Sequence, residues 1–193
     1  MLTIGFVINP LAGIGGSVAL KGSDGANTVE QALAKGGALK AQQRGAVALE
    51  NIIPVKDQIQ FICFDGAMGA DLLEQLDLSF EIVGQAVSST TNSTDTINAV
   101  NAFVAHDVDL ILFVGGDGTA RDIYSAIDQA TPVLGIPSVV KMHSGVFALS
   151  PSTAGEIIRL LITGAMVSVS SQEVRDIDEE AYRQERVKSR YFG

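Results

Sequence analysis

Two glycine-rich segments carry the residue types best suited to chemistry. One reads Gly115-Gly-Asp-Gly-Thr119, the other reads Asn9-Pro-Leu-Ala-Gly13, and each directly follows an apolar run. Glycine lets the backbone adopt positive φ angles and come within hydrogen-bond distance of a phosphate, and a threonine hydroxyl adds a donor. The first segment therefore predicts a phosphate site, with contacts expected from Gly115, Gly116, Gly118 and Thr119.

Asp117 is the exceptional residue of this segment, because a carboxylate among phosphate-binding amides repels its ligand. Its presence is explained if it receives a proton from an attacking hydroxyl, holds a ribose hydroxyl or shares a Mg²⁺ ion. We therefore expect Asp117 to be the catalytic residue. The alternative is a tight turn between a strand and a helix, in which Asp117 only caps the helix.

The second segment is expected at the same edge of the sheet, where the two turns would hold a nucleotide between them. Asn9 supplies both a donor and an acceptor. Lys21 neutralises a phosphate in this interpretation, and a solvated surface lysine is the alternative. The expected contacts of this segment are Asn9, Pro10, Gly13, Gly15, Gly16 and Lys21.

Other candidate residues carry weaker signals. Thr91 and Asp95 begin a helix and would meet phosphate or ribose, with ordinary capping as the alternative. His143 follows a strand and is expected to line the same cleft, unless it is a surface or hydrogen-bonded histidine. His106 suits the negative end of a helix dipole, and Cys63 lies in an apolar strand as an inert core residue. The sequence identifies no metal ligands.

The elements that must position these residues alternate along the chain. Apolar runs predict strands at 2–8, 60–64, 80–83, 108–114 and 131–136. Helical spacing predicts helices at 40–51, around 72–76, after 94, from 120 and from 151. Strands alternating with helices imply parallel crossovers, so we expect a doubly wound α/β domain with a mostly parallel sheet and helices on both faces.

Finer expectations concern the helix that starts at Pro151. Thr153 and Glu156 have the spacing of a capping box. Its buried face is expected to contain Ala154, Ile157, Ile158 and Leu161, and the preceding helix is expected to bury Ala120, Ile123 and Ile127.

A change of composition places a domain boundary near residue 165. We expect residues 1–164 to form the nucleotide-binding domain and 165–193 to form a charged tail, since 173–190 holds eleven of the 35 charged residues. The tail is either a solvated helix around 179–183 or the first strands of an incomplete second domain. An exposed strand at 167–169 would be covered by another subunit, which predicts a homo-oligomer.

Composition excludes several classes of protein. Thirteen basic and 22 acidic residues leave a net charge of −9, which repels phosphate backbones, so nucleic acid is not an expected partner. Residues 1–20 lack charge, but Asn9-Pro10 and the glycines argue against a signal peptide or membrane span. A single cysteine excludes an intrachain disulfide framework. We expect a soluble, cytoplasmic protein without a membrane partner.

The two segments together resemble the superfamily of ATP-dependent NAD kinases and diacylglycerol or sphingosine kinases. Three longer strings resemble, more narrowly, the bacterial ATP-NAD kinase-like proteins, over a span from the first strand to about residue 190. These strings are Leu20-Lys-Gly-Ser-Asp-Gly25, Gly118-Thr-Ala-Arg-Asp122 and Gly135-Ile-Pro137 with Lys141-Met-His-Ser144.

The resemblance implies a Rossmann-like nucleotide-binding domain that transfers a phosphoryl group from ATP or polyphosphate to the 2′-hydroxyl of NAD with Mg²⁺. By this match Asp117 lies closest to the acceptor hydroxyl. The chain departs from the NAD kinase pattern because it has no Asn-Glu or Asn-Asp pair, and Ser144-Gly-Val-Phe147 matches Gly-x-Leu-Gly-Phe only in part. The alternatives are a non-catalytic nucleotide-binding or regulatory homologue and a lipid or small-alcohol kinase.

Overall fold

A five-stranded parallel sheet forms the centre of the protein in a computed structural model. The structure describes residues 1–14, 40–88, 90–127, 130–139, 142–165, 168–177 and 189–192. The strands lie in the order β3-β2-β1-β4-β5. Their bounds are β1 (Leu2–Ile8), β2 (Ile59–Phe64), β3 (Phe80–Gly84), β4 (Leu110–Gly115) and β5 (Val133–Pro137). The predicted doubly wound α/β fold is confirmed.

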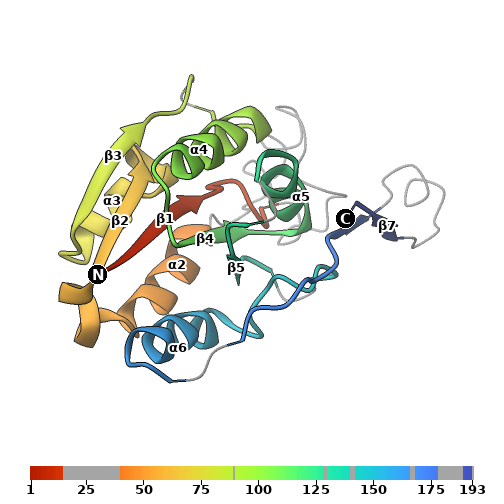
Figure 1. The fold of residues 1–193 in the computed structure, drawn as a ribbon. Helices are drawn as coiled ribbons and strands as arrows, with labels where there is room; N and C mark the ends of the chain where they lie inside the picture. Colours follow the sequence, from red (N-terminus) through yellow and green to blue (C-terminus); the bar gives the residue numbers. More distant parts are fainter. Residues whose placement is uncertain are drawn as a thin grey trace.

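Helices cover both faces of this sheet (Figure 1). One face carries α2 (Ala41–Glu50), α3 (Ala70–Gln75) and α6 (Pro151–Ile162). The other carries α4 (Ser93–Ala105) and α5 (Asp117–Ala126). Two short 3₁₀ helices, η2 (Ile53–Gln58) and η3 (Gly66–Met68), flank β2.

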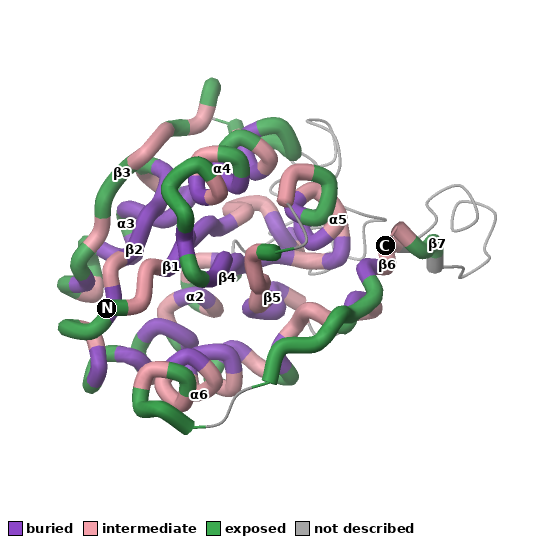
Figure 2. The backbone as a smooth tube through the Cα atoms, viewed as in Figure 1, coloured by how far each residue is buried: buried purple, intermediate pink, exposed green. Residues whose placement is uncertain are grey.

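Alternating side chains of the central strands supply a separate core to each face. In β1, Phe6 packs toward the α2 side and Val7 toward the α4 side; in β4, Leu112 and Phe113 divide in the same way. All four are buried, and Figure 2 shows buried backbone in the central strands β1 and β4. Successive residues of a strand point to opposite faces, so a strand covered on both faces is apolar throughout, as the runs at 2–8 and 110–114 are.

The order of the strands creates a switch point between β1 and β4. From β1 the chain builds outward through β2 to β3, and it then crosses to β4 on the other side of β1. In open α/β sheets, ligands bind beyond the carboxyl ends of the strands at such a point. The two glycine-rich segments follow β1 and β4, so the topology brings both of them to this position.

The start of α6 differs from the sequence-based expectation. Ser150 caps the helix by accepting a hydrogen bond from the Thr153 backbone N–H at 3.1 Å. Glu156 instead pairs with Arg159, whose Nε donates to its carboxylate at 2.8 Å. The Thr153/Glu156 capping box is therefore wrong, because Ser150 already occupies the capping position. Leu161, expected in the buried face, is 37% exposed near the end of the helix.

Helix α5 ends at Ala126, one residue before Ile127, the last residue of its predicted buried face. Ala120 and Ile123 are buried as expected, whereas Ile127 is the C-cap of α5, adopts an extended backbone and is only half-buried.

The segment after residue 165 contributes a small antiparallel pair, β6 (Arg175–Ile177) with β7 (Ser189–Tyr191). The predicted helix around 179–183 lies outside the described residues. Val174, which precedes β6, is 5% exposed and belongs to the core cluster of α4 and α5. This part of the tail is therefore packed against the first 164 residues.

The strand expected at 167–169 is not found where the structure describes the chain. Residues 168–170 have no regular secondary structure and are exposed, with Val169 at 74%. Val167 lies outside the described residues.

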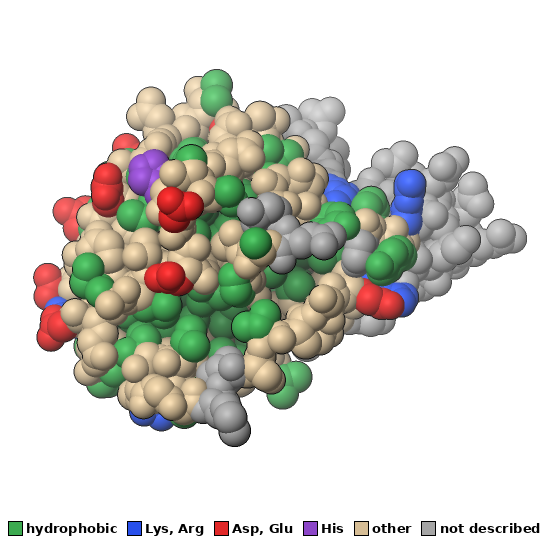
Figure 3. Space-filling model, viewed as in Figure 1, with side chains coloured by type: hydrophobic (Ala, Val, Ile, Leu, Met, Phe, Trp, Pro, Cys, Tyr) green, Lys and Arg blue, Asp and Glu red, His purple; other side chains and the backbone are tan. Residues whose placement is uncertain are grey.

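The surface agrees with the net negative charge of the sequence. Acidic side chains outnumber basic ones on the face drawn in Figure 3, and hydrophobic side chains gather there between β5 and α6.

Cys63 is fully buried, and desolvation raises the pKa of its thiol to about 12, so it stays a neutral core residue. Among the described residues, no helix is both long and apolar enough to span a bilayer.

Candidate functional site

The two glycine-rich turns meet at the carboxyl edge of the sheet. The Asn9 backbone N–H donates to the Val114 carbonyl at 3.0 Å, which extends the pairing of β1 with β4. The Asn9 side-chain Nδ2 then donates to Thr119 Oγ1 at 3.0 Å. Gly115 makes this approach possible, since a Cβ there would lie 2.5 Å from the Cβ of Thr119. Residues 110 positions apart thus form one site.

A third turn, which follows β5, joins the first two. The Ser138 backbone N–H donates to the Gly115 carbonyl at 2.9 Å. Gly13, with φ of +81°, lies so close that an added Cβ would be 2.8 Å from Val139 Cγ1. Ser138 and Val139 were not among the sequence candidates, whereas His143, later in the same segment, was. The place of Ser138 and Val139 directly after an apolar strand was a usable signal.

The Ser138 hydroxyl has an unusual position at this junction. Ser138 is 3% exposed, and its Oγ is the one fully buried side-chain nitrogen or oxygen of the described residues without a hydrogen-bond partner. The oxygen lies 3.6 Å and 4.0 Å from the Cβ positions of Gly13 and Gly116. A buried hydroxyl without a partner lowers the stability of the fold by about 1–3 kcal/mol. The Ser138 hydroxyl can therefore still make a hydrogen bond to a ligand that reaches the space between the two turns.

Helix α5 begins at Asp117, three residues before the predicted start at Ala120. Gly116 is its N-cap, and no side chain caps the helix. Gly118 and Thr119 therefore belong to the first turn, where backbone N–H groups have no intrahelical acceptor and the helix dipole favours an anion.

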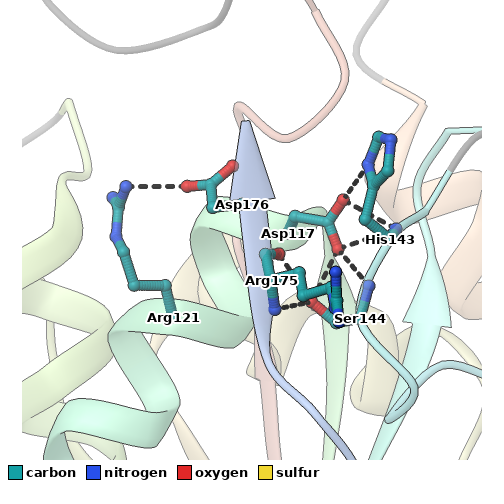
Figure 4. A network of polar contacts seen from close by, with 6 residues as sticks. All are labelled: Asp117, Arg121, His143, Ser144, Arg175 and Asp176. Carbon is teal, nitrogen blue, oxygen red and sulfur yellow. Dashed lines mark hydrogen bonds and ion pairs between the residues drawn. The ribbon is translucent and has the colours of Figure 1, made fainter. Parts of the chain in front are cut away.

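The Asp117 carboxylate points away from a capping position and holds the segment after β5 (Figure 4). Oδ2 accepts hydrogen bonds from the His143 backbone N–H at 2.9 Å and ring Nδ1 at 3.0 Å. Oδ1 accepts from the Ser144 backbone N–H at 2.9 Å and hydroxyl at 2.7 Å. The side chain of Asp117 is 8% exposed. The helix-capping alternative for Asp117 is therefore wrong.

Ser144 connects this carboxylate to the tail. Its Oγ accepts from the Arg175 backbone N–H at 3.0 Å and lies 2.8 Å from the Arg175 carbonyl oxygen. Beside it, Arg121 Nη1 of α5 donates to Asp176 Oδ2 at 2.7 Å (Figure 4). Asp117 and the first residues of β6 are thus parts of one polar network.

The remaining candidates are residues at a helix start, a residue of the first turn, and three that lie outside the described residues. Asp95 is 1% exposed, and its carboxylate accepts from the Val87 and Asn92 backbone N–H groups at 3.0 and 2.9 Å, which completes a capping box with Asn92. Thr91 is half-buried just before this helix start. Pro10 lies in the first turn beside Asn9. The expected contacts Gly15, Gly16 and Lys21 lie outside the described residues.

His106 occupies the C-cap of α4, and its Nδ1 lies 2.7 Å from the Ala102 carbonyl oxygen. The predicted interaction with the end of that helix is therefore seen as a direct hydrogen bond.

The described part of the chain contains no group of three or more His, Cys, Asp or Glu side chains that could hold a metal ion. The Asp117 carboxylate is already committed to the four donors of residues 143 and 144. These residues do not by themselves fit a Mg²⁺ cage.

Comparison with protein families gives one match. The model of the ATP-NAD kinase N-terminal domain matches residues 4–166, which include most of β1, all of β2 to β5 and the three turns of the site. Searches of curated proteins and of solved structures found no match.

Proposed function

The chain belongs to the ATP-NAD kinase N-terminal domain family, and from this premise we propose that it transfers a phosphoryl group from ATP or polyphosphate to the 2′-hydroxyl of NAD. The observation that carries the proposal is the Asn9–Thr119 hydrogen bond, which joins the two glycine-rich turns at the switch point of the sheet. Two such turns at a switch point can hold a nucleotide between them, because ligands of open α/β sheets bind in the crevice beyond the carboxyl ends of the strands.

The phosphates would bind at the start of α5. Its first N–H groups have no side-chain cap, and an added Cβ at Gly116 or Gly118 would meet no atom closer than 3.7 Å, so the backbone there is open to a ligand. Thr119 Oγ1 accepts from Asn9, which leaves its own proton for a phosphate oxygen. The unpartnered hydroxyl of Ser138 supports the same position, since a polar ligand atom would satisfy it.

Mg²⁺ would enter this site with the nucleotide. Magnesium is commonly held by one or two carboxylates together with substrate phosphates and waters.

A second candidate function is nucleotide binding without turnover. It is favoured by the Asp117 carboxylate, whose two oxygens already accept four hydrogen bonds and are therefore not free to receive a substrate proton. A kinase for a lipid or another small alcohol is the other acceptor class of the superfamily.

One assay separates these functions. The purified chain is incubated with Mg²⁺, ATP or polyphosphate, and NAD, and NADP is measured. Formation of NADP supports the proposal. ATP binding by calorimetry without any NADP supports the non-catalytic homologue, and phosphorylation of a small alcohol in place of NAD supports the third candidate.

Thr119→Val tests the phosphate site itself. This substitution keeps the shape of the side chain but removes both the proposed donor to phosphate, a loss of about 1.5–3 kcal/mol, and the acceptor of the Asn9 hydrogen bond that joins the two turns. Both losses act at this site, so the Kd for ATP should rise at least roughly 10-fold. Thr163→Val is the matched control, because Thr163 is exposed at the end of α6. Equal affinity in the two variants would place the phosphates elsewhere.

We further propose a cytoplasmic location and nucleotide and dinucleotide ligands, without nucleic-acid partners. The net charge of −9 supports the last point, because it opposes binding to a phosphate backbone.

A further inference from the structure

The transfer proposed above needs an acceptor for the proton of the attacking hydroxyl, and we infer that this acceptor is Nε2 of His143, with Asp117 as the residue that positions the ring. The inference rests on the proposed function. It also changes the role expected of Asp117 from the sequence, which was to take the proton directly.

Asp117 is fully engaged as an acceptor. A carboxylate offers about four lone-pair directions, and the backbone and side chains of His143 and Ser144 approach all of them, at 2.7–3.0 Å. With four donor groups around it and its side chain 8% exposed, the carboxylate is less accessible to a substrate than the His143 ring, which is 22% exposed.

The His143 ring, in contrast to the Asp117 carboxylate, has one nitrogen available to accept a proton. Its ring Nδ1 faces Asp117 Oδ2 at 3.0 Å, and a carboxylate only accepts, so in the neutral ring the proton lies on Nδ1 and the lone pair on Nε2. Nε2 is the ring nitrogen on the far side from Asp117 (Figure 4). The ring is 22% exposed, and no hydrogen bond to Nε2 occurs among the described residues.

The ring is also held rigidly. The His143 backbone N–H binds the same Asp117 oxygen as the ring, and the next residue is tied both to Asp117 and to Arg175. A carboxylate that fixes the tautomer and orientation of an imidazole, whose other nitrogen then removes a hydroxyl proton, is an arrangement known from hydrolases. Here the same arrangement stands beside the start of α5.

The proposed reaction is phosphoryl transfer from ATP to the 2′-hydroxyl of NAD. The acceptor oxygen forms a bond to the terminal phosphorus of ATP, and the bond from that phosphorus to its bridging oxygen breaks, releasing ADP. The hydroxyl proton moves to His143 Nε2, and the imidazolium later returns it to water. Phosphoryl transfer is mainly positioning and charge stabilisation, so this proton acceptor adds to the binding site rather than replacing it.

The experiment compares His143→Ala, His143→Asn and His106→Asn in the full chain. In His143→Asn the new side-chain amide can still donate to Asp117 where Nδ1 does, but it offers nothing in place of Nε2. General-base catalysis contributes about 10²–10⁴-fold, so kcat for NADP formation should fall at least ~100-fold in both His143 variants, with KM for ATP and NAD within about threefold. Added imidazole should restore part of the activity of His143→Ala.

The control and the contrary outcomes are distinct. His106→Asn changes the other histidine of the chain, at the far end of α4, and should behave as the wild type. Wild-type rates in His143→Asn would mean that the ring only supports Asp117. A loss confined to KM for ATP would mean that His143 contacts phosphate, and absence of imidazole rescue would also overturn the inference. A wild-type chain that makes no NADP would instead overturn the proposed function, and this inference with it.

Discussion

At the scale of single residues, the site depends on the hydrogen bonds of two polar side chains, Asp117 and Ser138. Asp117 uses both oxygens to bind residues 143 and 144, while Ser138, at the neighbouring turn, has no partner for its hydroxyl. The first arrangement stabilises the fold and the second costs stability, so substitutions at these positions should act in opposite directions.

Asp117→Asn should lower the free energy of unfolding by about 1–3 kcal/mol, because the amide NH₂ would face donors that now meet a carboxylate oxygen. Urea unfolding measures this change. The same substitution should also lower turnover, since Asp117 positions the His143 ring. Asp77→Asn is the control, since the Asp77 side chain is 95% exposed and its pair with Lys56 contributes little.

Ser138→Ala should raise the free energy of unfolding of the ligand-free protein by about 1 kcal/mol, since it removes a buried hydroxyl without a partner. Ser144→Ala should have the opposite effect, because the Ser144 hydroxyl bonds both Asp117 and Arg175. Thermal unfolding of the two variants side by side tests this. A loss of stability in Ser138→Ala would show that its hydroxyl is satisfied in solution.

At the scale of elements, close approaches decide where glycine is required. Gly155 of α6 packs so closely on α2 that an added Cβ would overlap the Ala48 carbonyl oxygen. Gly118, in the first turn of α5, has only Asp176 Oδ2 and Arg121 Nη2 nearby, at 3.7 and 3.9 Å. The same chemical change therefore has different consequences in the two helices.

Gly155→Ala should destabilise the protein by about 1–3 kcal/mol, because α2 and α6 must move apart to admit the methyl group. Gly118→Ala should leave stability unchanged or raise it by up to ~1 kcal/mol, since alanine favours the helix and the space is open. Denaturant midpoints of the two variants distinguish them, and equal midpoints would contradict the packing of α6 on α2.

At the scale of the whole molecule, the tail and the first 164 residues share a core. Val174 is buried with the α4 and α5 residues, and Arg121 pairs with Asp176 across the same contact. The domain boundary near residue 165 stays a prediction, but residues 174–176 pack on the first domain wherever that boundary lies.

Val174→Ala should lower the free energy of unfolding by about 1–3 kcal/mol through lost core packing. Val169→Ala, a few residues earlier and 74% exposed, should change it by less than about 0.5 kcal/mol. If both substitutions were silent in a melting experiment, the tail would be detached from the core in solution.

A homo-oligomer remains a prediction. Exposed apolar side chains at Leu149 and Val169, 96% and 74% exposed, are available to a second copy of the chain. Size-exclusion chromatography with light scattering at micromolar concentration should give a mass of at least two chains, and a mass of one chain would contradict this prediction.

The sequence by itself determined the elements and the two principal turns. Its apolar runs placed all five sheet strands within two residues of their observed ends, and the glycine-rich strings marked the turns after β1 and β4. These features are local: strand burial appears as a continuous apolar run, and a turn that approaches a ligand requires glycine at fixed positions.

Only the tertiary structure decided which groups meet. Asp117 and His143 are 26 residues apart, and Asn9 and Thr119 are 110 apart, so no spacing in the chain predicts their bonds. The order of the strands brings the turn after β5 beside the other two turns, where the side-chain hydroxyl of Ser138 has no hydrogen-bond partner. Tertiary packing also places Val174 in the core cluster of α4 and α5. Such pairings depend on how the elements pack in three dimensions, because hydrogen bonds and core contacts are short-ranged in space and independent of distance along the chain.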